Sequence, residues 1–195
     1  MPPTSALGPG DALLLVDVQR DFCPGGALPI PEGDRVVPVL NRWLRAAGAR
    51  GVPVTASRDW HPPRHPSFRE QGGPWPPHCL QDSEGARFHP GLELPPDALL
   101  VTKGTRYDRD QLSAFDETGL AALLSRLGVR RLFVGGLALD VCVLATALDG
   151  VRAGLAVRIV AGGALPVTPE GGRAARERLR AAGVEEAEDP AGDAA

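Results

Sequence analysis

The chain has 195 residues, of which 43% are hydrophobic, and this size is typical of one globular domain with a buried core. Its net charge of -3 at pH 7 and the lack of a Lys/Arg run argue against a nucleic-acid partner. The apolar runs are too short to cross a bilayer, and the N-terminal residues do not read as a signal peptide. We therefore expect a cytoplasmic protein without a nucleic-acid or membrane partner, whose three cysteines are free thiols.

Short apolar runs alternate with amphipathic segments along the chain. The continuous apolar run in residues 11–17 predicts a strand that is buried on both faces, as in a parallel sheet. Residues 34–48 have helical spacing, and residues 52–55 predict a second strand that begins late or lies off-centre because of its proline. The later segments predict, in order, strand 98–102, helix 120–127 closed by Gly128, strand 131–134, helix 140–151, strand 155–160 and helix 172–182.

This alternation predicts an α/β fold with three layers (αβα), in which helices cover both faces of a mainly parallel central sheet. We expect a single domain over residues 1–195, with residues 1–10 and 186–195 as frayed tails. The sequence is also compatible with one more short strand before the acidic C-terminal tail. Sites in such folds lie beyond the carboxyl ends of the strands.

Four polar side chains follow predicted strands at that edge, namely Asp17, Asp59, Lys103 and Cys142. Asp17 ends an apolar strand, where a buried charge needs a partner, and Lys103 ends another apolar strand and could be that partner. The pair could serve only to fix the strand ends. Together with the thiol, however, it predicts a nucleophilic site in which the carboxylate takes the thiol proton and the ammonium stabilises negative charge.

Cys142 lies in the sequence GGLALDVCV, at a transition from strand to helix. If Asp140 caps that helix, the thiol lies in the first turn, where free N–H groups and the helix dipole should lower its pKa. The alternative is a buried cysteine that packs like an alanine. Cys142 alone slightly favours the alternative, whereas Asp17 and Lys103 on the same edge favour the reactive thiol.

The stretch RDWHPPRHPSFREQGGPWPPHC (residues 58–79) contains three of the four histidines and begins a connection that runs to about residue 96. A connection of this length inside a compact domain indicates a function. Asp59 and His61 are two residues apart in extended chain, so both can point to one metal ion. The donors suit Zn, Mn or Fe, and the third ligand could be His65, His78 or His89. The alternative is a set of solvent-exposed histidines beside aromatic residues.

Six motifs together cover nearly the whole chain, and their order and spacing are specific. They are DVQRDF (17–22), the glycine pair 25–26, SRDWHP (57–62), GPWPPHC (73–79), KGTRYDRDQLSAF (103–115) and GLALDVCV (136–143). In these motifs the chain resembles the nicotinamidase/pyrazinamidase group of the isochorismatase-like cysteine hydrolases. The resemblance implies that Asp17, Lys103 and Cys142 form a catalytic triad.

The resemblance also implies one divalent metal ion, zinc before Mn or Fe, held by Asp59, His61 and His78. It implies a cis peptide bond between Ala138 and Leu139, next to an oxyanion hole that includes the N–H of Cys142. His65 and His89 match no ligand position, so we expect them at the surface or at the pocket rim. Phe22, Trp60 and Trp75 are candidates for the flat apolar walls of the pocket.

The implied activity is the hydrolysis of nicotinamide to nicotinate and ammonia through a cysteine thioester, with the metal orienting the substrate. Leu112, Leu139 and Val141 differ from residues that the family often has, and they flank the nucleophile or the pocket. A related amidase that acts on another carboxamide or carbamoyl group therefore stays open. So does a non-catalytic binding protein that keeps the fold. The sequence is compatible with a homo-oligomer.

Overall fold

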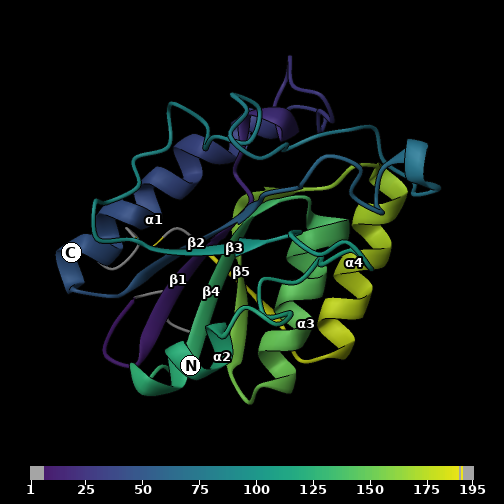
Figure 1. Ribbon diagram of the computed structural model, residues 1–195. Helices are drawn as coiled ribbons and strands as arrows, with labels where there is room; N and C mark the ends of the chain where they lie inside the picture. The colour runs from purple at the N-terminus through teal and green to yellow at the C-terminus, as the bar shows by residue number, and fades with distance from the viewer. Residues whose placement is uncertain (1–6, 189, 191–195) are drawn as a thin grey trace.

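The described strands form one parallel sheet in the order β3-β2-β1-β4-β5-β6. Figure 1 shows the sheet between α1 on one side and α3 and α4 on the other. The computed structural model describes residues 7–188 and 190. The strands are β1 (Asp11–Val16), β2 (Val54–Asp59), β3 (Leu99–Lys103), β4 (Arg131–Leu137), β5 (Ala156–Leu165) and β6 (Glu185–Ala187). Every pair of neighbouring strands is parallel, which confirms the predicted class of sheet.

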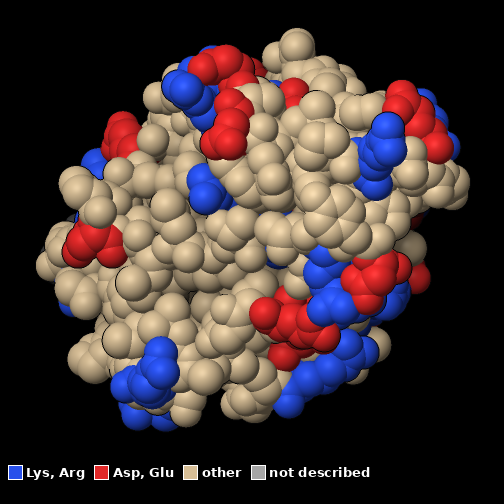
Figure 2. All heavy atoms as spheres, in the orientation of Figure 1, with Lys and Arg blue, Asp and Glu red and all other residues tan. Residues whose placement is uncertain are grey.

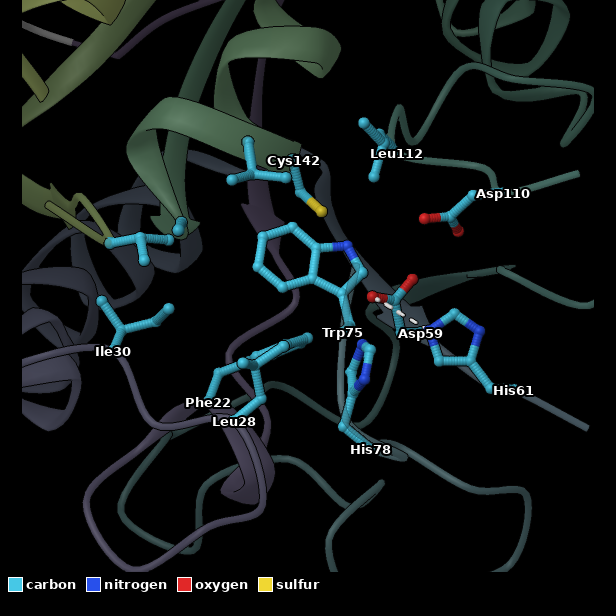
Figure 3. Close-up of a pocket in the computed structure, with 13 residues that line it drawn as sticks. Phe22, Leu28, Ile30, Asp59, His61, Trp75, His78, Asp110, Leu112 and Cys142 are labelled. Carbon is cyan, nitrogen blue, oxygen red and sulfur yellow. Dashed lines mark ion pairs between the residues drawn. The ribbon is translucent and has the colours of Figure 1, made fainter. Parts of the chain in front are cut away.

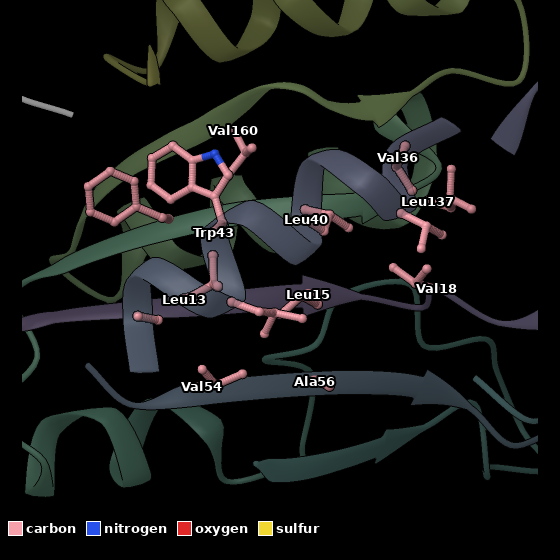
Figure 4. Packing of buried hydrophobic residues seen from close by; sticks show 14 of the residues in the cluster. Leu13, Leu15, Val18, Val36, Leu40, Trp43, Val54, Ala56, Leu137 and Val160 are labelled. Carbon is pink, nitrogen blue, oxygen red and sulfur yellow. The ribbon is translucent and has the colours of Figure 1, made fainter. Parts of the chain in front are cut away.

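In the part of the chain that the structure describes, four α-helices cover the two faces of the sheet. They are α1 (Val36–Arg50), α2 (Leu120–Arg126), α3 (Leu144–Arg152) and α4 (Pro169–Ala181). Alternate residues of β1 enter different clusters, because successive side chains of a strand point to opposite faces. Leu13 and Leu15 pack in the cluster of α1, as Figure 4 shows, and Leu14 packs in the cluster that contains residues of α2, α3 and α4. The predicted three layers are therefore confirmed.

The observed boundaries differ from the predicted ones at strand ends and at helix ends. Strands β2, β4 and β5 all run further than the sequence predicts, to Asp59, Leu137 and Leu165. Helix α1 continues past Gly48 and ends before Gly51, which adopts a left-handed conformation with φ of 63°. Helix α4 begins earlier than expected, because the Thr168 side chain accepts a hydrogen bond from the N–H of Gly171 and Pro169 occupies the first turn. Strand β2 begins at Val54, after the proline, as the sequence suggested.

Parts of the two predicted tails are ordered in the described chain. Leu7 is buried, and the carbonyl of Gly10 accepts hydrogen bonds from the N–H groups of Arg130 and Arg131. At the other end, residues 186 and 187 belong to β6, the additional short strand, and Ala187 is buried. Residues 1–6, 189 and 191–195 lie outside the described residues.

Helix length and the distribution of surface charge can be compared with the sequence. Within the described ranges, no helix is both long enough and apolar enough to cross a membrane. On the face shown in Figure 2, basic and acidic side chains lie mixed, and much of the middle is uncharged. On that face the basic side chains do not gather into one broad patch.

Candidate active site

The carboxyl ends of four adjacent strands bring the predicted residues together. Lys103 ends β3 and lies beside Asp59, which ends β2 and pairs with it in the sheet register. Asp17 follows β1, and Cys142 follows β4 on the other side of β1. These four residues, which are far apart in the sequence, therefore meet at one edge of the sheet, as the rule for parallel sheets predicts.

Lys103 lies at the centre of this cluster and is fully buried. Its Nζ atom lies 2.8 Å from Asp17 Oδ2, 2.6 Å from Asp59 Oδ1 and 3.5 Å from Cys142 Sγ. It also donates a hydrogen bond to the main-chain oxygen of Gln111 at 3.3 Å. Burial lowers the pKa of Lys103, but Asp17 and Asp59 outweigh burial and hold that pKa well above its usual value. The lysine is therefore a cation between two acids.

The two acids differ in their affinity for a proton. Burial raises the pKa of Asp17 to about 6, although Lys103 and the hydroxyl of Ser57, which donates to Asp17 Oδ1 at 2.7 Å, oppose that rise. Burial also acts on Asp59, but Lys103 and His61 outweigh it and hold the pKa of Asp59 below its usual range. Asp17 can therefore exchange a proton near neutral pH, while Asp59 stays ionised.

Cys142 lies in a tight turn that precedes α3. Residues Leu139–Val143 form a π-helical turn, and the α-helix begins only at Leu144. Asp140 does not cap it, since its carboxylate accepts a hydrogen bond from the N–H of Val167 at 2.8 Å. Burial raises the pKa of the Cys142 thiol well above its usual value, although Lys103 opposes this. The predicted lowering of the thiol pKa is therefore wrong for the free protein, and the thiol needs a base.

The cis peptide bond lies one position earlier than the resemblance implies. It joins Leu137 to Ala138, rather than Ala138 to Leu139. The reason for the shift is that β4 continues to Leu137, so the junction between strand and turn falls directly after that residue. Ala138 lines the pocket beside Cys142, whereas Leu139 is buried in the core cluster of α3.

Asp59, His61 and His78 offer donor atoms that all lie within 4.8 Å of one another, and all three residues are buried. His61 Nδ1 lies 2.8 Å from the carbonyl oxygen of Gly104, and His78 Nδ1 lies 2.8 Å from that of Pro76. Each carbonyl can accept the Nδ1 proton, which leaves both Nε2 atoms as metal ligands. One carboxylate and two imidazoles held in this way fit a divalent ion such as zinc.

Gly104 is required where it lies. Its φ of 68° is left-handed, and a Cβ atom there would lie 2.5 Å from the ring of His61. The close approach allows the Gly104 carbonyl to accept the His61 proton. Gly104 thus holds the ring of His61, one of the metal-donor residues, in place. The motif KG alone did not predict this contact.

His65 is not at the surface, so that expectation is wrong. It is fully buried, its ring lies 4.2 Å from that of His61, and its Nδ1 lies 2.7 Å from the hydroxyl of Ser67. The reason is that the chain folds back after it, which places Phe68 against both rings. Burial and His61 lower the pKa of His65 to about 4, so this ring is neutral. His89 is half-buried, and its Nδ1 accepts from the N–H of Gly91.

One pocket joins the thiol to the metal group and contains about 410 Å³ of empty space, part of it open to solvent. Figure 3 shows Cys142 on one side, His78 on the other and Trp75 between them in this view. The lining residues are Phe22, Leu28, Ile30, Asp59, His61, Trp75, His78, Asp110, Leu112, Ala138, Val141, Cys142 and Val167. The lining is mostly apolar with a few convergent polar groups, as in sites for small molecules.

Trp60 does not line this pocket, unlike Phe22 and Trp75. It lies between Asp59 and His61 in extended chain, so its side chain points to the opposite side. There its ring lies 4.0 Å from the guanidinium of Arg58. Sequence reasoning also missed the lining residues Leu28, Ile30, Asp110 and Val167, which come from separate segments; only Asp110 lay within a motif of the resemblance.

Residues 11–188 match the family described as Isochorismatase domain. The chain belongs to this isochorismatase family. It is 39% identical to the nicotinamidase of Escherichia coli K12 over 199 residues, which cover 90% of this chain and 93% of that protein. The part that matches the family includes the residues around the thiol and the metal-donor residues, namely Asp17, Lys103 and Cys142, and Asp59, His61 and His78.

Solved structures of the isochorismatase family show the same fold. The pyrazinamidase of Pyrococcus horikoshii in complex with zinc superposes with a TM-score of 0.89 at 43% identity, covering 92% of this chain and 99% of that one. PnC1 from L. infantum, in complex with nicotinate, has a TM-score of 0.85 at 36% identity and covers 94% of both chains. These values extend the similarity to nearly the whole chain.

Proposed function

We propose that this protein is a nicotinamidase, which hydrolyses nicotinamide to nicotinate and ammonia. The observation that carries the proposal is one pocket in which a thiol, its acid and amine partners and a metal-donor group converge. The activity named for the relative from E. coli and the nicotinate bound to PnC1 support the choice of substrate.

The first half of the reaction uses the triad. Ionised Asp17 accepts the proton of Cys142 while Sγ attacks the carboxamide carbon, and Lys103 keeps the acid and the sulfur in place. Main-chain N–H groups of the turn at Ala138, Leu139 and Cys142 are proposed to stabilise the oxyanion. Protonated Asp17 then gives its proton to the departing nitrogen, so ammonia leaves and a thioester remains.

The second half of the reaction regenerates the thiol. Asp17 accepts a proton from a water molecule, and that water attacks the thioester carbon. The carbon–sulfur bond breaks and the proton returns from Asp17 to the sulfur of Cys142. The nicotinic acid that forms then releases its proton to water and leaves as nicotinate. The pKa of Asp17, about 6, suits both directions of proton transfer near neutral pH.

We propose that Asp59, His61 and His78 hold a divalent ion, zinc before Mn or Fe. When bound, the ion supplies a Lewis-acidic point that orients the pyridine ring. The flat faces of Phe22 and Trp75 are proposed to enclose that ring, because both line the pocket. The zinc complex of the pyrazinamidase supports the choice of metal.

All proposed groups come from one chain, so the reaction itself requires no second copy. We further propose that the chain works as a single domain in the cytoplasm, where a reducing environment protects a thiol nucleophile. Light scattering of the purified protein measures its mass in solution and tests for a homo-oligomer.

The decisive test is ammonia release by zinc-loaded protein from nicotinamide, benzamide and an N-carbamoyl compound. Benzamide is the matched control, because it has the same shape but lacks the ring nitrogen. We expect nicotinamide to be hydrolysed fastest. No ammonia from nicotinamide, with zinc confirmed bound, would contradict the substrate assignment, and faster release from the carbamoyl compound would favour the related amidase. If none of the three compounds released ammonia, with zinc confirmed bound, the non-catalytic alternative would be supported.

A further inference from the structure

The segment that follows β1, DVQRD (residues 17–21), contains three alternating polar residues, of which the proposed reaction uses only Asp17. We propose that the other two, Gln19 and Asp21, are positioning residues that hold the two arms of the metal group in register. The first arm is residues 59–61 and the second arm is residues 78–79. This inference rests on the proposed metal site.

Gln19 holds the first arm through its side-chain amide and is fully buried. Its Oε1 atom accepts a hydrogen bond from the N–H of Asp59 at 2.7 Å, and its Nε2 atom donates to the carbonyl oxygen of Asp59 at 2.8 Å. The second Nε2 proton goes to the carbonyl oxygen of Ala86 at 2.8 Å. The oxygen and the nitrogen of this amide therefore both bond to main-chain groups, and only one orientation of the amide makes all three hydrogen bonds.

Asp21 holds the second arm through its carboxylate. Its Oδ2 atom accepts a hydrogen bond from the N–H of Cys79, the residue after His78, at 2.7 Å. Its Oδ1 atom accepts from the N–H of Ala27 at 3.0 Å. The N–H of Leu28, a lining residue of the pocket, donates to the carbonyl oxygen of Asp21. Asp21 thus links the second arm to the apolar wall.

The two arms also bond to each other, which closes a ring. The N–H of His61 donates to the carbonyl oxygen of Cys79 at 2.9 Å, so both sides of the Cys79 residue are held. The ring of contacts passes from Cys79 to Asp21 by a hydrogen bond and along the main chain to Gln19. It then passes by hydrogen bonds from Gln19 to Asp59 and along the main chain to His61. A closed ring fixes the main chain at both arms, and ligand geometry depends on that main chain. Loss of such outer contacts typically weakens metal affinity by about 10- to 100-fold.

The test measures zinc affinity by competition with a chromophoric chelator, which does not depend on turnover. We expect Gln19→Met, which keeps the length and removes all three hydrogen bonds, to bind zinc at least about tenfold more weakly. Asp21→Asn keeps one acceptor oxygen, so we expect a smaller weakening in the same direction. With cobalt(II) in place of zinc, the visible spectrum of Gln19→Met should also change, because the donors are displaced.

Two controls separate positioning from general effects. Asn41 of α1 also uses its buried amide on main chain, donating to Gly91 and accepting from Glu93, in the same long connection but away from the arms. Asn41→Leu should therefore bind zinc within about twofold of the natural protein. Asp34→Asn controls for charge, because exposed Asp34 lines the same surface hollow as Asp21 without bonding to either arm.

The outcomes are distinct. Zinc affinities of Gln19→Met and Asp21→Asn within about twofold of the natural protein would overturn the inference, and so would an equal loss in Asn41→Leu or Asp34→Asn. If Gln19→Met does not fold, judged by circular dichroism, Asp21→Asn decides. Natural protein that binds no zinc would overturn this inference together with the metal site. Natural protein that binds zinc but releases no ammonia would contradict the proposed function alone, and the affinities would still decide the inference.

Discussion

Asp59 Oδ1 lies 2.6 Å from the ammonium nitrogen of Lys103, at the end of the adjacent strand. The other oxygen of the same carboxylate lies 3.7 Å from His61 Nε2. Asp59 therefore contacts Lys103, the partner of the thiol, through one oxygen, and lies near the metal-donor residue His61 through the other. Lys103 in turn separates two acids that would otherwise face each other without a counter-charge.

Lys103→Met should destabilise the protein strongly, because it leaves Asp17 and Asp59 buried without their cation. We expect the free energy of unfolding, measured in urea, to fall by about 3–5 kcal/mol, and turnover to fall to background. Arg45→Met is the control, since it removes an exposed ion pair with Glu93 and should cost less than about 1 kcal/mol. An equal cost in both variants would show that burial does not decide the effect.

Cys142→Ala should abolish ammonia release, with a loss of at least about 10³-fold, because the attacking sulfur is removed. Cys23→Ala removes another buried thiol that lies outside this pocket, so it should retain most of the activity. Both rates are measured with zinc content matched between the proteins. Substantial turnover by Cys142→Ala would show that the thiol is not the nucleophile.

The fold and the meeting of Asp17, Asp59 and Lys103 at one sheet edge were predictable because the signals are local, whereas the choice of His78 among three histidines came from the family resemblance alone. Asp17 and Lys103 end or directly follow apolar runs, Asp59 closes the strand between them, and parallel strands bring such positions together. The buried position of His65 was not predictable, since it depends on where the chain folds back at Phe68. The apolar pocket wall at Leu28 and Ile30 depends likewise on long-range packing.

The error in the thiol pKa has a different origin. Sequence showed that Cys142 precedes a helix, and a helix N-terminus favours an anion. It did not show the depth of burial, which acts in the opposite direction and is the larger effect. Nor did it show that Asp140 turns its carboxylate to Val167 rather than to the helix.

The pH dependence of kcat/KM should follow Asp17, whose pKa burial raises to about 6. Protonated Asp17 cannot accept the thiol proton, so kcat/KM should fall about tenfold for each pH unit below 6 and reach a plateau above it. The assay contains excess zinc, because acid also protonates His61 and His78 and releases the metal. A flat profile between pH 5 and 7 would contradict the role of Asp17 as base.

The same pKa affects stability with the opposite sign. The folded protein holds the Asp17 proton up to about pH 6, whereas the unfolded chain releases it near the ordinary value of 3.8. Between these values the folded state binds more protons, so the contribution of Asp17 to the free energy of unfolding decreases as pH rises. Asp17→Asn should remove this contribution, and urea unfolding at pH 4 and pH 7 measures the difference.

His78→Ala should lose zinc, because it removes one of three donors whose atoms lie within 4.8 Å of one another. We expect the zinc dissociation constant to rise by more than about tenfold, and kcat/KM for nicotinamide to fall with it. His89→Ala is the matched control, since His89 lies in the same long connection but outside the metal-donor groups of the described residues. Equal zinc affinity in His78→Ala and the natural protein would exclude His78 as a ligand.

Phe22→Leu should weaken substrate binding more than it slows the reaction. The ring of Phe22 lies 5.5 Å from that of His78 and lines the pocket, so it is positioned to contact a flat substrate ring and not the reacting bond. Contacts that are equal in the ground state and the transition state affect KM rather than kcat. We therefore expect KM for nicotinamide to rise about tenfold with little change in kcat.

Trp60→Leu is the control for this aromatic wall, because Trp60 precedes His61 but points away from the pocket and contacts Arg58. Its KM and kcat should stay within about twofold of the natural values, since half-buried Trp60 packs against the core cluster of α1 and does not touch the pocket. Steady-state kinetics of both variants, with zinc saturating, provides the comparison. If Trp60→Leu raised KM as much as Phe22→Leu, the effect would come from the shape of the whole connection rather than from contact with the substrate ring.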